Sequence, residues 1–299
     1  MREELLGFLK MHDVKYKERT RLADISPIRI GGLTEAVIYP DTPGKLISLI
    51  ELLENNKFHY KILGRMSNVL PADKENDLII VRTDLMRDIR FDGQIVVAEC
   101  GVSIPSLANF LLSNGLSGME GISGIPGSVG GATVGNAGAF GREMADILVD
   151  IDLYDPISKE CFSLRAHQLE FAYRYSKLKD SGLVLLSSSI KPTPASFVSI
   201  KNEMDRVKQL RLNTQPTDFP SLGSVFKRTP NLPAAKLIDE CGLKGYTVGG
   251  TQVSTKHAGF ILNVGGATAN DFIKLSDYVS NVVYDRYKIR LEREVEILQ

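Results

Sequence analysis

A run of regularly spaced glycines constrains this 299-residue chain more than any other feature. In the segment GLSGMEGISGIPGSVGGATVGNAGAFG, residues 115–141, a glycine stands at every third position from Gly115 to Gly130. Collagen is excluded, because its triple helix needs long proline-rich triplet arrays and this stretch contains only Pro126. A flexible linker is also a poor match, since large apolar side chains separate the glycines. The segment therefore predicts a folded loop with buried side chains.

Two interpretations of this loop stay open on its own sequence. Glycine permits positive φ angles and a close approach of the main chain, so several N–H groups can point into one concavity that suits an anion such as pyrophosphate. The alternative is a set of tight turns in a crowded core. Glycine-rich motifs occur in both settings.

The charge balance and the scattered ligand residues exclude several classes of function. Lys plus Arg and Asp plus Glu both number 36, so no overall field favours nucleic acid or an anionic membrane. Charges interrupt the short apolar run at the N-terminus, and no apolar run is long enough to span a bilayer, so we expect a cytoplasmic protein. The three cysteines and four histidines are widely spaced without a CxxC motif, and they predict neither disulfides nor a metal site.

Short β-branched runs alternate with amphipathic stretches along the chain. The apolar runs predict strands at 60–63, 78–81, 95–99, 147–155, 183–190 and 289–298. The amphipathic spacing predicts helices at 46–56, 104–115, 198–212, 234–242 and 268–288, with Thr42 as the cap of the first. Two prolines in KPTPAS, residues 191–196, break the pattern and indicate a domain boundary.

The common nucleotide-binding motifs do not explain the glycine loop. No GxGxxG follows a strand, and no GxxxxGK[ST] is present, so neither a Rossmann site nor a P-loop is predicted. GLKG, residues 242–245, has the form of the clamp loop of a KH RNA-binding domain. The neutral charge balance favours the end of a helix at this place instead.

Three further stretches carry chemistry-bearing side chains. In FAYRYSKLK, Arg174 stands between two tyrosines, where a buried guanidinium needs an anionic partner. In PSLGSVFKR, Ser224 follows a glycine and precedes two cations, which suits either a hydroxyl facing a ligand or an ordinary turn serine. In IRLEREVEIL the alternation of apolar and charged residues places Glu294 on the solvated face of a strand.

The order of the motifs adds information that none of them carries alone. Six motifs follow one another along the chain, namely ILGRMSN, GISGIPGSVGGATVGNAGAFGREM, YRYSK, PSLGSVFKR, AAKLIDECGLKGYTVGGTQVSTKHAGFILN and EREVEIL. Together they resemble the UDP-N-acetylenolpyruvoylglucosamine reductases, flavoenzymes of peptidoglycan precursor synthesis, over about residues 20–299, and the shorter second type of this enzyme in particular. One departure is Met66, because the family usually has a third glycine in the loop that reads GRMSN here.

The resemblance implies an α+β fold, in which a two-lobed FAD-binding region of the vanillyl-alcohol-oxidase/PCMH type is joined to a C-terminal α+β substrate domain. The expected domains are 1–83 and 84–195 for the two FAD-binding lobes and 196–299 for the substrate domain. The FAD is expected to be noncovalent, because the sequence offers no clear attachment residue.

By the same resemblance the glycine segment wraps the FAD pyrophosphate and the edge of the flavin ring, with the GRMSN loop as the opposite wall. The implied cofactor-binding residues are Gly64, Ser67, Asn68, Gly124, Ile125, Pro126, Gly127, Ser128, Gly130, Gly131, Asn136, Ala137 and Gly138.

The reaction implied is the NADPH-dependent reduction of the enolpyruvyl ether of UDP-N-acetylglucosamine to UDP-N-acetylmuramate. The binding partners implied are then NADPH and the UDP-sugar, which use one cleft in turn. The sequence does not indicate the oligomeric state. Arg174 matches the arginine that holds the carboxylate and the developing enolate. Ser224 matches the serine that protonates the enolate carbon, and Glu294 the acid that assists the enolate when protonated. Lys227 and Arg228 are expected to bind the nucleotide diphosphate.

Two alternatives belong beside this hypothesis. One is a flavin oxidoreductase of similar cofactor fold that acts on an alcohol or a sugar. The other is a non-catalytic nucleotide-sugar binding protein that has lost its flavin, which Met66 in the first loop keeps open. Bound yellow flavin excludes the second alternative, and substrate-dependent reoxidation of the reduced flavin excludes the first.

Overall fold

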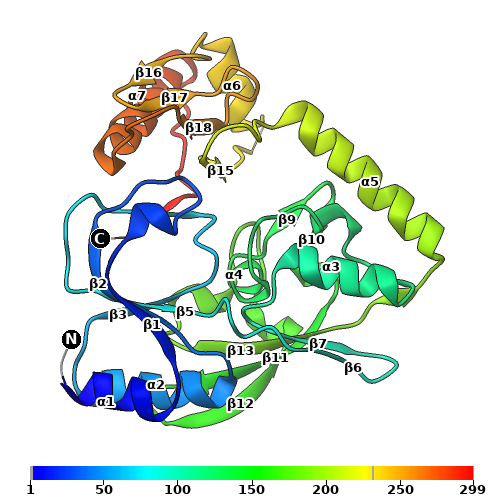
Figure 1. Ribbon diagram of the computed structural model, residues 1–299. Helices are drawn as coiled ribbons and strands as arrows, with labels where there is room; N and C mark the ends of the chain where they lie inside the picture. The colour runs from blue at the N-terminus through cyan, green and yellow to red at the C-terminus, as the bar shows by residue number, and fades with distance from the viewer. Residues whose placement is uncertain (1–2, 231, 299) are drawn as a thin grey trace. The chain divides into compact units, whose positions relative to one another are not determined.

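The computed structural model, which describes residues 3–230 and 232–298, divides into two compact units (Figure 1). The first unit contains the chain through Glu18 together with residues 35–65 and 77–209. The second contains residues 19–34 and 66–76 together with the chain from Leu210 onward. Both units are thus discontinuous, whereas the expected domains 1–83, 84–195 and 196–299 are consecutive and stay a prediction.

A four-stranded sheet has the order β1-β2-β5-β3, and β2 and β3 both run parallel to β5. Its strands are β1 (Lys15–Arg21), β2 (Leu33–Tyr39), β3 (Tyr60–Leu63) and β5 (Ile79–Arg82). Two helices belong to the same part of the chain, α1 (Glu3–Met11) and α2 (Pro43–Asn55). Thr42 caps α2 as predicted, because its side chain accepts a hydrogen bond of 3.2 Å from the N–H of Lys45.

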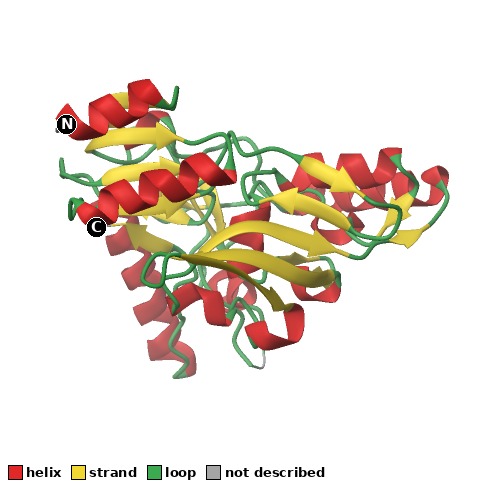
Figure 2. Ribbon diagram, turned by 90° about the horizontal axis from the view of Figure 1, so that it is seen from below, coloured by secondary structure: helices red, strands yellow, loops and turns green. Residues whose placement is uncertain are grey.

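A five-stranded antiparallel sheet has the order β12-β11-β13-β7-β6. Its strands are β6 (Ile89–Phe91), β7 (Val96–Glu99), β11 (Leu148–Asp155), β12 (Glu160–Arg165) and β13 (Val184–Ile190). Figure 2, where strands are yellow, shows the longer of these strands as a twisted layer. Every residue of β13 is buried, which agrees with its nearly continuous apolar and small side chains.

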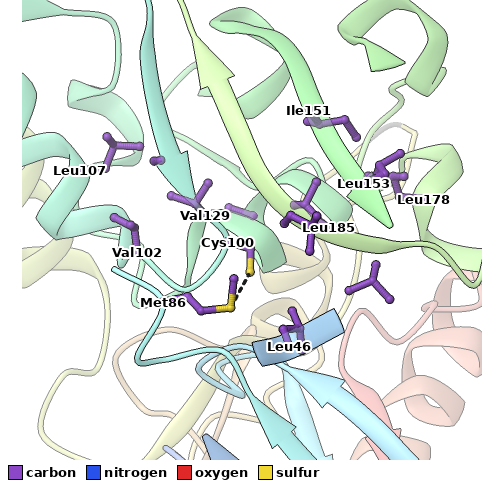
Figure 3. Packing of buried hydrophobic residues seen from close by; sticks show 14 of the residues in the cluster. Leu46, Met86, Cys100, Val102, Leu107, Val129, Ile151, Leu153, Leu178 and Leu185 are labelled. Carbon is purple, nitrogen blue, oxygen red and sulfur yellow. Dashed lines mark hydrogen bonds between the residues drawn. The ribbon is translucent and has the colours of Figure 1, made fainter. Parts of the chain in front are cut away.

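Helices α3 (Ile104–Ser113) and α4 (Val129–Val134) lie on the same side of the five-stranded sheet (Figure 1). The core of the first unit fills the space between these elements (Figure 3). Cys100 lies in it, with its Sγ 4.0 Å from Sδ of Met86. The glycine segment is therefore built over a well-packed core.

The second unit has a four-stranded sheet of order β15-β18-β17-β16 and a separate parallel pair of β4 and β19. Its strands are β4 (Val69–Pro71), β15 (Ser221–Ser224), β16 (Thr247–Val248), β17 (Thr251–Val253), β18 (Phe260–Asn263) and β19 (Glu296–Leu298). The helices are α6 (Ala234–Glu240) and α7 (Ala269–Tyr287), and the boundary between the units falls within α5 (Phe197–Thr214). A second apolar core lies among these elements, with Phe272, Leu275 and Val283 of α7 fully buried.

Short elements complete the chain. They are η1 (Leu22–Asp24), β8 (Leu116–Ser117), η2 (Glu120–Ile122), β9 (Gly138–Ala139), β10 (Arg142–Glu143), η3 (Met144–Asp146), η4 (Ala166–Leu169), η5 (Lys177–Asp180) and β14 (Thr193–Pro194). The predicted strand at 289–298 is wrong in its length, because only Glu296–Leu298 finds a continuous partner strand. None of the helices within residues 3–230 and 232–298 combines the length and apolar character of a membrane span.

Candidate active site

The glycine segment folds as a loop followed by a short helix. Ser128 caps α4, since its hydroxyl accepts a hydrogen bond of 3.2 Å from the N–H of Gly131. At the other end of α4, the N–H of Ala137 donates to the carbonyl of Ala132 and that of Asn136 to the carbonyl of Thr133. This pair of bonds is a Schellman motif, with Asn136 in the left-handed conformation (φ 42°) that glycine usually supplies.

Several main-chain donors of the loop before α4 have no acceptor in the part of the chain that the structure describes. The N–H groups of Gly124, Gly127 and Ser128 donate to nothing within residues 3–230 and 232–298. Gly127 and Ser128 are buried residues, and buried N–H groups without a partner are rare in folded proteins. Such a group of donors fits a bound anion, in agreement with the first interpretation of the glycine loop.

Two glycines of the candidate site lie so close to a neighbouring residue that a Cβ atom would clash with it. A Cβ atom at Gly64 would lie 2.2 Å from Oγ of Ser128, and one at Gly130 would lie 2.9 Å from Cβ of Cys100. Gly64 therefore lets its loop approach the glycine segment, and Gly130 lets α4 approach the core. Burial raises the pKa of the Cys100 thiol to about 12, so Cys100 is a packing residue and not a nucleophile.

Arg174 stands in a tight turn. Ala172 and Tyr175, the residues at its base, exchange two backbone hydrogen bonds of 3.1 Å. Arg174 has φ 56°, a conformation that costs a non-glycine residue about 1–2 kcal/mol. Its guanidinium lies 5.1 Å from the ring centre of Tyr173 and donates a hydrogen bond of 3.0 Å to the carbonyl of Gly138. The same left-handed φ occurs at Arg29, Lys57 and Lys159, so backbone strain alone does not mark Arg174 as a functional residue.

Two buried side chains attach this turn to the glycine segment. The side-chain amide of Asn136 donates a hydrogen bond of 3.0 Å to the carbonyl of Ala172. The hydroxyl of Ser176 donates one of 2.7 Å to the carbonyl of Val134. Sequence reasoning missed Ser176, although it belongs to the YRYSK motif. The structure thus brings together Arg174, Asn136 and Gly138.

In the second unit, Ser224 and Glu294 lie on adjacent segments. The N–H of Glu294 donates to the carbonyl of Val225 at 2.8 Å, and Phe226 forms a β-bridge with Arg293. Ser224 is exposed, and its hydroxyl donates a hydrogen bond of 3.3 Å to the carbonyl of Phe226. Glu294 is half-buried and belongs to no regular strand, contrary to its predicted place on the solvated face of one.

The GRMSN loop reaches the same segment through Asn68. Its side-chain amide donates a hydrogen bond of 2.9 Å to the carbonyl of Glu294, and its own carbonyl accepts one of 3.0 Å from Glu296. Ser67 is half-buried and makes no hydrogen bond within residues 3–230 and 232–298. Asn68 therefore holds the Glu294 segment, and its expected place in the cofactor wall stays a prediction.

The two cations after Ser224 differ in their surroundings. Lys227 forms an ion pair with Glu292, and the main chains of the two residues are also hydrogen-bonded at 2.9 Å. Arg228 is exposed. Over the described ranges, 3–230 and 232–298, no group of three or more His, Cys, Asp or Glu side chains is arranged to hold a metal ion.

Comparison with known proteins shows the family to which the chain belongs. The family model described as the C-terminal domain of UDP-N-acetylenolpyruvoylglucosamine reductase matches residues 215–298, and an FAD-binding domain model matches residues 34–159. The UDP-N-acetylenolpyruvoylglucosamine reductase of Caldanaerobacter subterraneus subsp. tengcongensis is 38% identical over 270 residues, which cover 90% of this chain and 89% of that protein. The enzyme of the same name from Streptococcus pneumoniae (strain JJA) is 38% identical over 298 residues, covering 100% and 98%. The chain belongs to the UDP-N-acetylenolpyruvoylglucosamine reductase family.

Solved structures agree with this membership. The UDP-N-acetylenolpyruvylglucosamine reductase of Thermus caldophilus superposes with a TM-score of 0.81 at 30% identity, covering 96% of this chain and 99% of that one. Berberine bridge enzyme superposes with a TM-score of 0.50 at 17% identity, covering 66% of this chain and 44% of that one, and shows the fold alone. The predicted family and the predicted α+β fold with an FAD-binding region are confirmed.

As a reductase of this family with an FAD-binding domain, the protein is an FAD-containing oxidoreductase. The unpartnered N–H groups of the glycine loop and the close approach at Gly64 fit that cofactor, because they offer fixed donors to a pyrophosphate without side chains in the way.

Proposed function

We propose that this protein reduces the enolpyruvyl ether of UDP-N-acetylglucosamine to the lactyl ether, UDP-N-acetylmuramate, in peptidoglycan precursor synthesis. NADPH is the reductant, and the FAD is noncovalent. The observation that carries the proposal is the pairing of the Ser224 segment with the Glu294 segment, joined by the 2.8 Å bond from Glu294 to Val225, in a member of the reductase family.

The cofactor residues proposed are Gly64, Ser67, Asn68, Gly124, Ile125, Pro126, Gly127, Ser128, Gly130, Gly131, Ala137 and Gly138. Asn136, which the resemblance placed in this set, is left out because its side chain is fully enclosed and hydrogen-bonded within the protein. FAD, when bound, supplies hydride that originates from NADPH. The main-chain donors of Gly124, Gly127 and Ser128 hold the pyrophosphate, and the partly exposed Ile125 and Pro126 pack on the flavin.

The substrate's methylene carbon gains a hydride, so negative charge develops on the adjacent carbon and its carboxylate. Arg174 holds this charge, because a guanidinium offers two parallel donors to a carboxylate. Glu294, when protonated, donates a hydrogen bond to the enolate. Ser224 delivers a proton to the enolate carbon. Lys227 and Arg228 bind the diphosphate, for which Lys227 exchanges its ion pair with Glu292.

The test separates the two halves of the reaction under anaerobic conditions. NADPH should bleach the yellow flavin, and the enolpyruvyl UDP-sugar should then restore its absorbance. Ser224→Ala should leave the bleaching almost intact, because hydride transfer to the flavin needs no proton from Ser224. It should slow the reoxidation by roughly 10²–10⁴-fold, the usual contribution of a positioned proton donor.

Three outcomes would contradict the proposal. Failure of the enolpyruvyl UDP-sugar to reoxidise the wild-type flavin would favour an oxidoreductase of alcohols or sugars instead. A colourless protein that binds no added FAD would favour a nucleotide-sugar binding protein. Equal reoxidation rates for wild type and Ser224→Ala would leave Ser224 as a turn residue, with the proton donor elsewhere.

A further inference from the structure

Asn136 is a fully enclosed polar side chain beside the Arg174 turn. None of its surface is exposed, so no ligand can touch it without a rearrangement of the protein. Burial of an amide is costly unless both of its ends are hydrogen-bonded. An asparagine at such a position therefore needs a reason other than direct contact with cofactor or substrate.

Both ends of the Asn136 amide have specific partners. Its nitrogen donates a hydrogen bond of 3.0 Å to the carbonyl of Ala172, and its oxygen accepts one of 3.1 Å from the N–H of Ala145. A carboxylate here would still accept from Ala145, but it would face the carbonyl of Ala172 with no proton to donate. The bonding pattern thus requires an amide in this orientation.

The backbone of Asn136 serves a different purpose. Its left-handed φ of 42° closes α4, and asparagine and glycine are the residues that adopt this conformation at least cost. The capping role accounts for the conformation alone, since glycine would fill it equally well. The amide is therefore the part that remains to be explained.

We infer that Asn136 is a positioning residue for Arg174, an inference that rests on the role proposed above for Arg174. Asn136 holds the carbonyl of Ala172, two residues before Arg174, while Arg174 holds the carbonyl of Gly138, two residues after Asn136. These two bonds connect the base and the tip of the Arg174 turn to the glycine segment. The strained turn is thereby held in place at both ends.

Loss of the amide donor should displace the guanidinium without removing it. A displacement of about 1 Å in a group that orients substrate can slow a reaction on the order of 10²-fold. The effect should fall on the step that uses Arg174. Flavin binding and the reduction of flavin by NADPH do not use Arg174 and should change little.

The test compares Asn136→Asp, Asn136→Gly, Arg174→Lys and the double variant Asn136→Asp/Arg174→Lys with the wild-type holoenzyme. Asn136→Asp keeps the acceptor for Ala145 and removes the donor, and Asn136→Gly keeps the left-handed cap and removes the whole amide. Both should retain FAD and be bleached by NADPH at the wild-type rate. Both should be reoxidised by the enolpyruvyl UDP-sugar on the order of 10²-fold more slowly. Hydrogen exchange should speed up at the amides of Ala172 and Tyr175 and stay unchanged in β13.

A matched control is Asn114→Asp, which removes the same kind of bond, a 2.8 Å donation to the carbonyl of Phe110, at the end of α3. It should leave both half-reactions unchanged. Because Asn136 acts through Arg174, the double variant should be reoxidised about as slowly as Arg174→Lys, with no additional loss.

The proposal is overturned if both Asn136 variants are reoxidised like wild type, if their losses multiply with that of Arg174→Lys, or if both half-reactions slow equally. It is also overturned if the Ala172 and Tyr175 amides keep their wild-type exchange rates in a variant with slowed reoxidation. A wild-type flavin that the UDP-sugar cannot reoxidise instead sinks the proposed function itself, so the two failures are distinguishable.

Discussion

Met66 stands in the first loop at the position where the resemblance to the family leads us to expect a glycine. Its φ is 57°, the left-handed region, and only 3% of its surface is exposed. Glycine would relieve backbone strain of about 1–2 kcal/mol. It would also remove a buried methionine side chain, whose truncation costs about 2–5 kcal/mol. The loss of packing is the larger effect, and it explains why a strained methionine persists here.

We therefore expect Met66→Gly to lower the free energy of unfolding by up to about 4 kcal/mol, the upper end of the difference between these two effects. Met66→Leu is the control, since it keeps both the strain and most of the volume and should cost less than about 1.5 kcal/mol. Urea unfolding of the three proteins measures both values. A Met66→Gly protein more stable than wild type would show that strain, and not packing, dominates at this position.

At the scale of elements, α4 is attached to the five-stranded sheet by a buried hydroxyl pair. Oγ1 of Thr133 lies 3.1 Å from Oγ of Ser188 on β13, and neither residue is exposed. Thr133→Val leaves the Ser188 hydroxyl without this partner and should cost about 1–3 kcal/mol, and Ser188→Ala should cost a similar amount. The double variant removes both polar groups and should cost less than the sum of the single changes. Strict additivity in a thermal or urea unfolding cycle would contradict this coupling.

His257 gives the turn before β18 a pH-dependent contribution to stability. Its Nδ1 accepts a hydrogen bond of 3.2 Å from the N–H of Gly259, which needs the unprotonated ring. Burial lowers the pKa of His257 below its ordinary 6.5. As the pH falls below about 6.5, His257 therefore takes up its proton in the unfolded chain before it does so in the folded protein. The stability that this difference in pKa contributes is present above about pH 6.5 and is lost as the pH falls toward the lower pKa of the folded protein.

His257→Asn should flatten this dependence, because an amide oxygen can accept the same bond but does not titrate. The free energy of unfolding of wild type, measured by urea unfolding, should fall more between pH 7.5 and pH 5.5 than that of the variant, with a difference of at most about 1.4 kcal/mol per pH unit. Equal losses in the two proteins would show that His257 does not contribute to acid sensitivity.

For the whole molecule, the unpartnered N–H groups of the glycine loop predict stabilisation by ligands that carry phosphate. FAD added to the flavin-free protein at 100 times its Kd should raise the free energy of unfolding by about 2.7 kcal/mol. Riboflavin, which has the same ring system and no phosphate, should raise the thermal midpoint less at equal concentration. Equal shifts would place the binding energy in the ring system and not in the loop donors.

The sequence by itself determined the elements whose signals are local. The predicted helices within α2, α3, α5, α6 and α7 and the strands at β3, β5, β7, β11 and β13 appear in the structure, because period, caps and burial pattern all act within one segment. The family followed from short motifs in a fixed order, which needs no knowledge of contacts. The glycine spacing indicated a folded loop for the same reason.

Only the tertiary structure decided which separate segments come together. The polar strand β1 gave no apolar signal, and the strand expected at 289–298 ends up as β19 alone, because its length depends on a partner at 69–71. Distant segments also decide the surroundings of two single residues. Glu294 is half-buried beside Val225, and Asn136 is enclosed beside Ala172. Their neighbours lie 69 and 36 positions away in the chain. Periodicity reports only on a residue's own segment, whereas burial and hydrogen bonding at these sites depend on distant segments that fold against it.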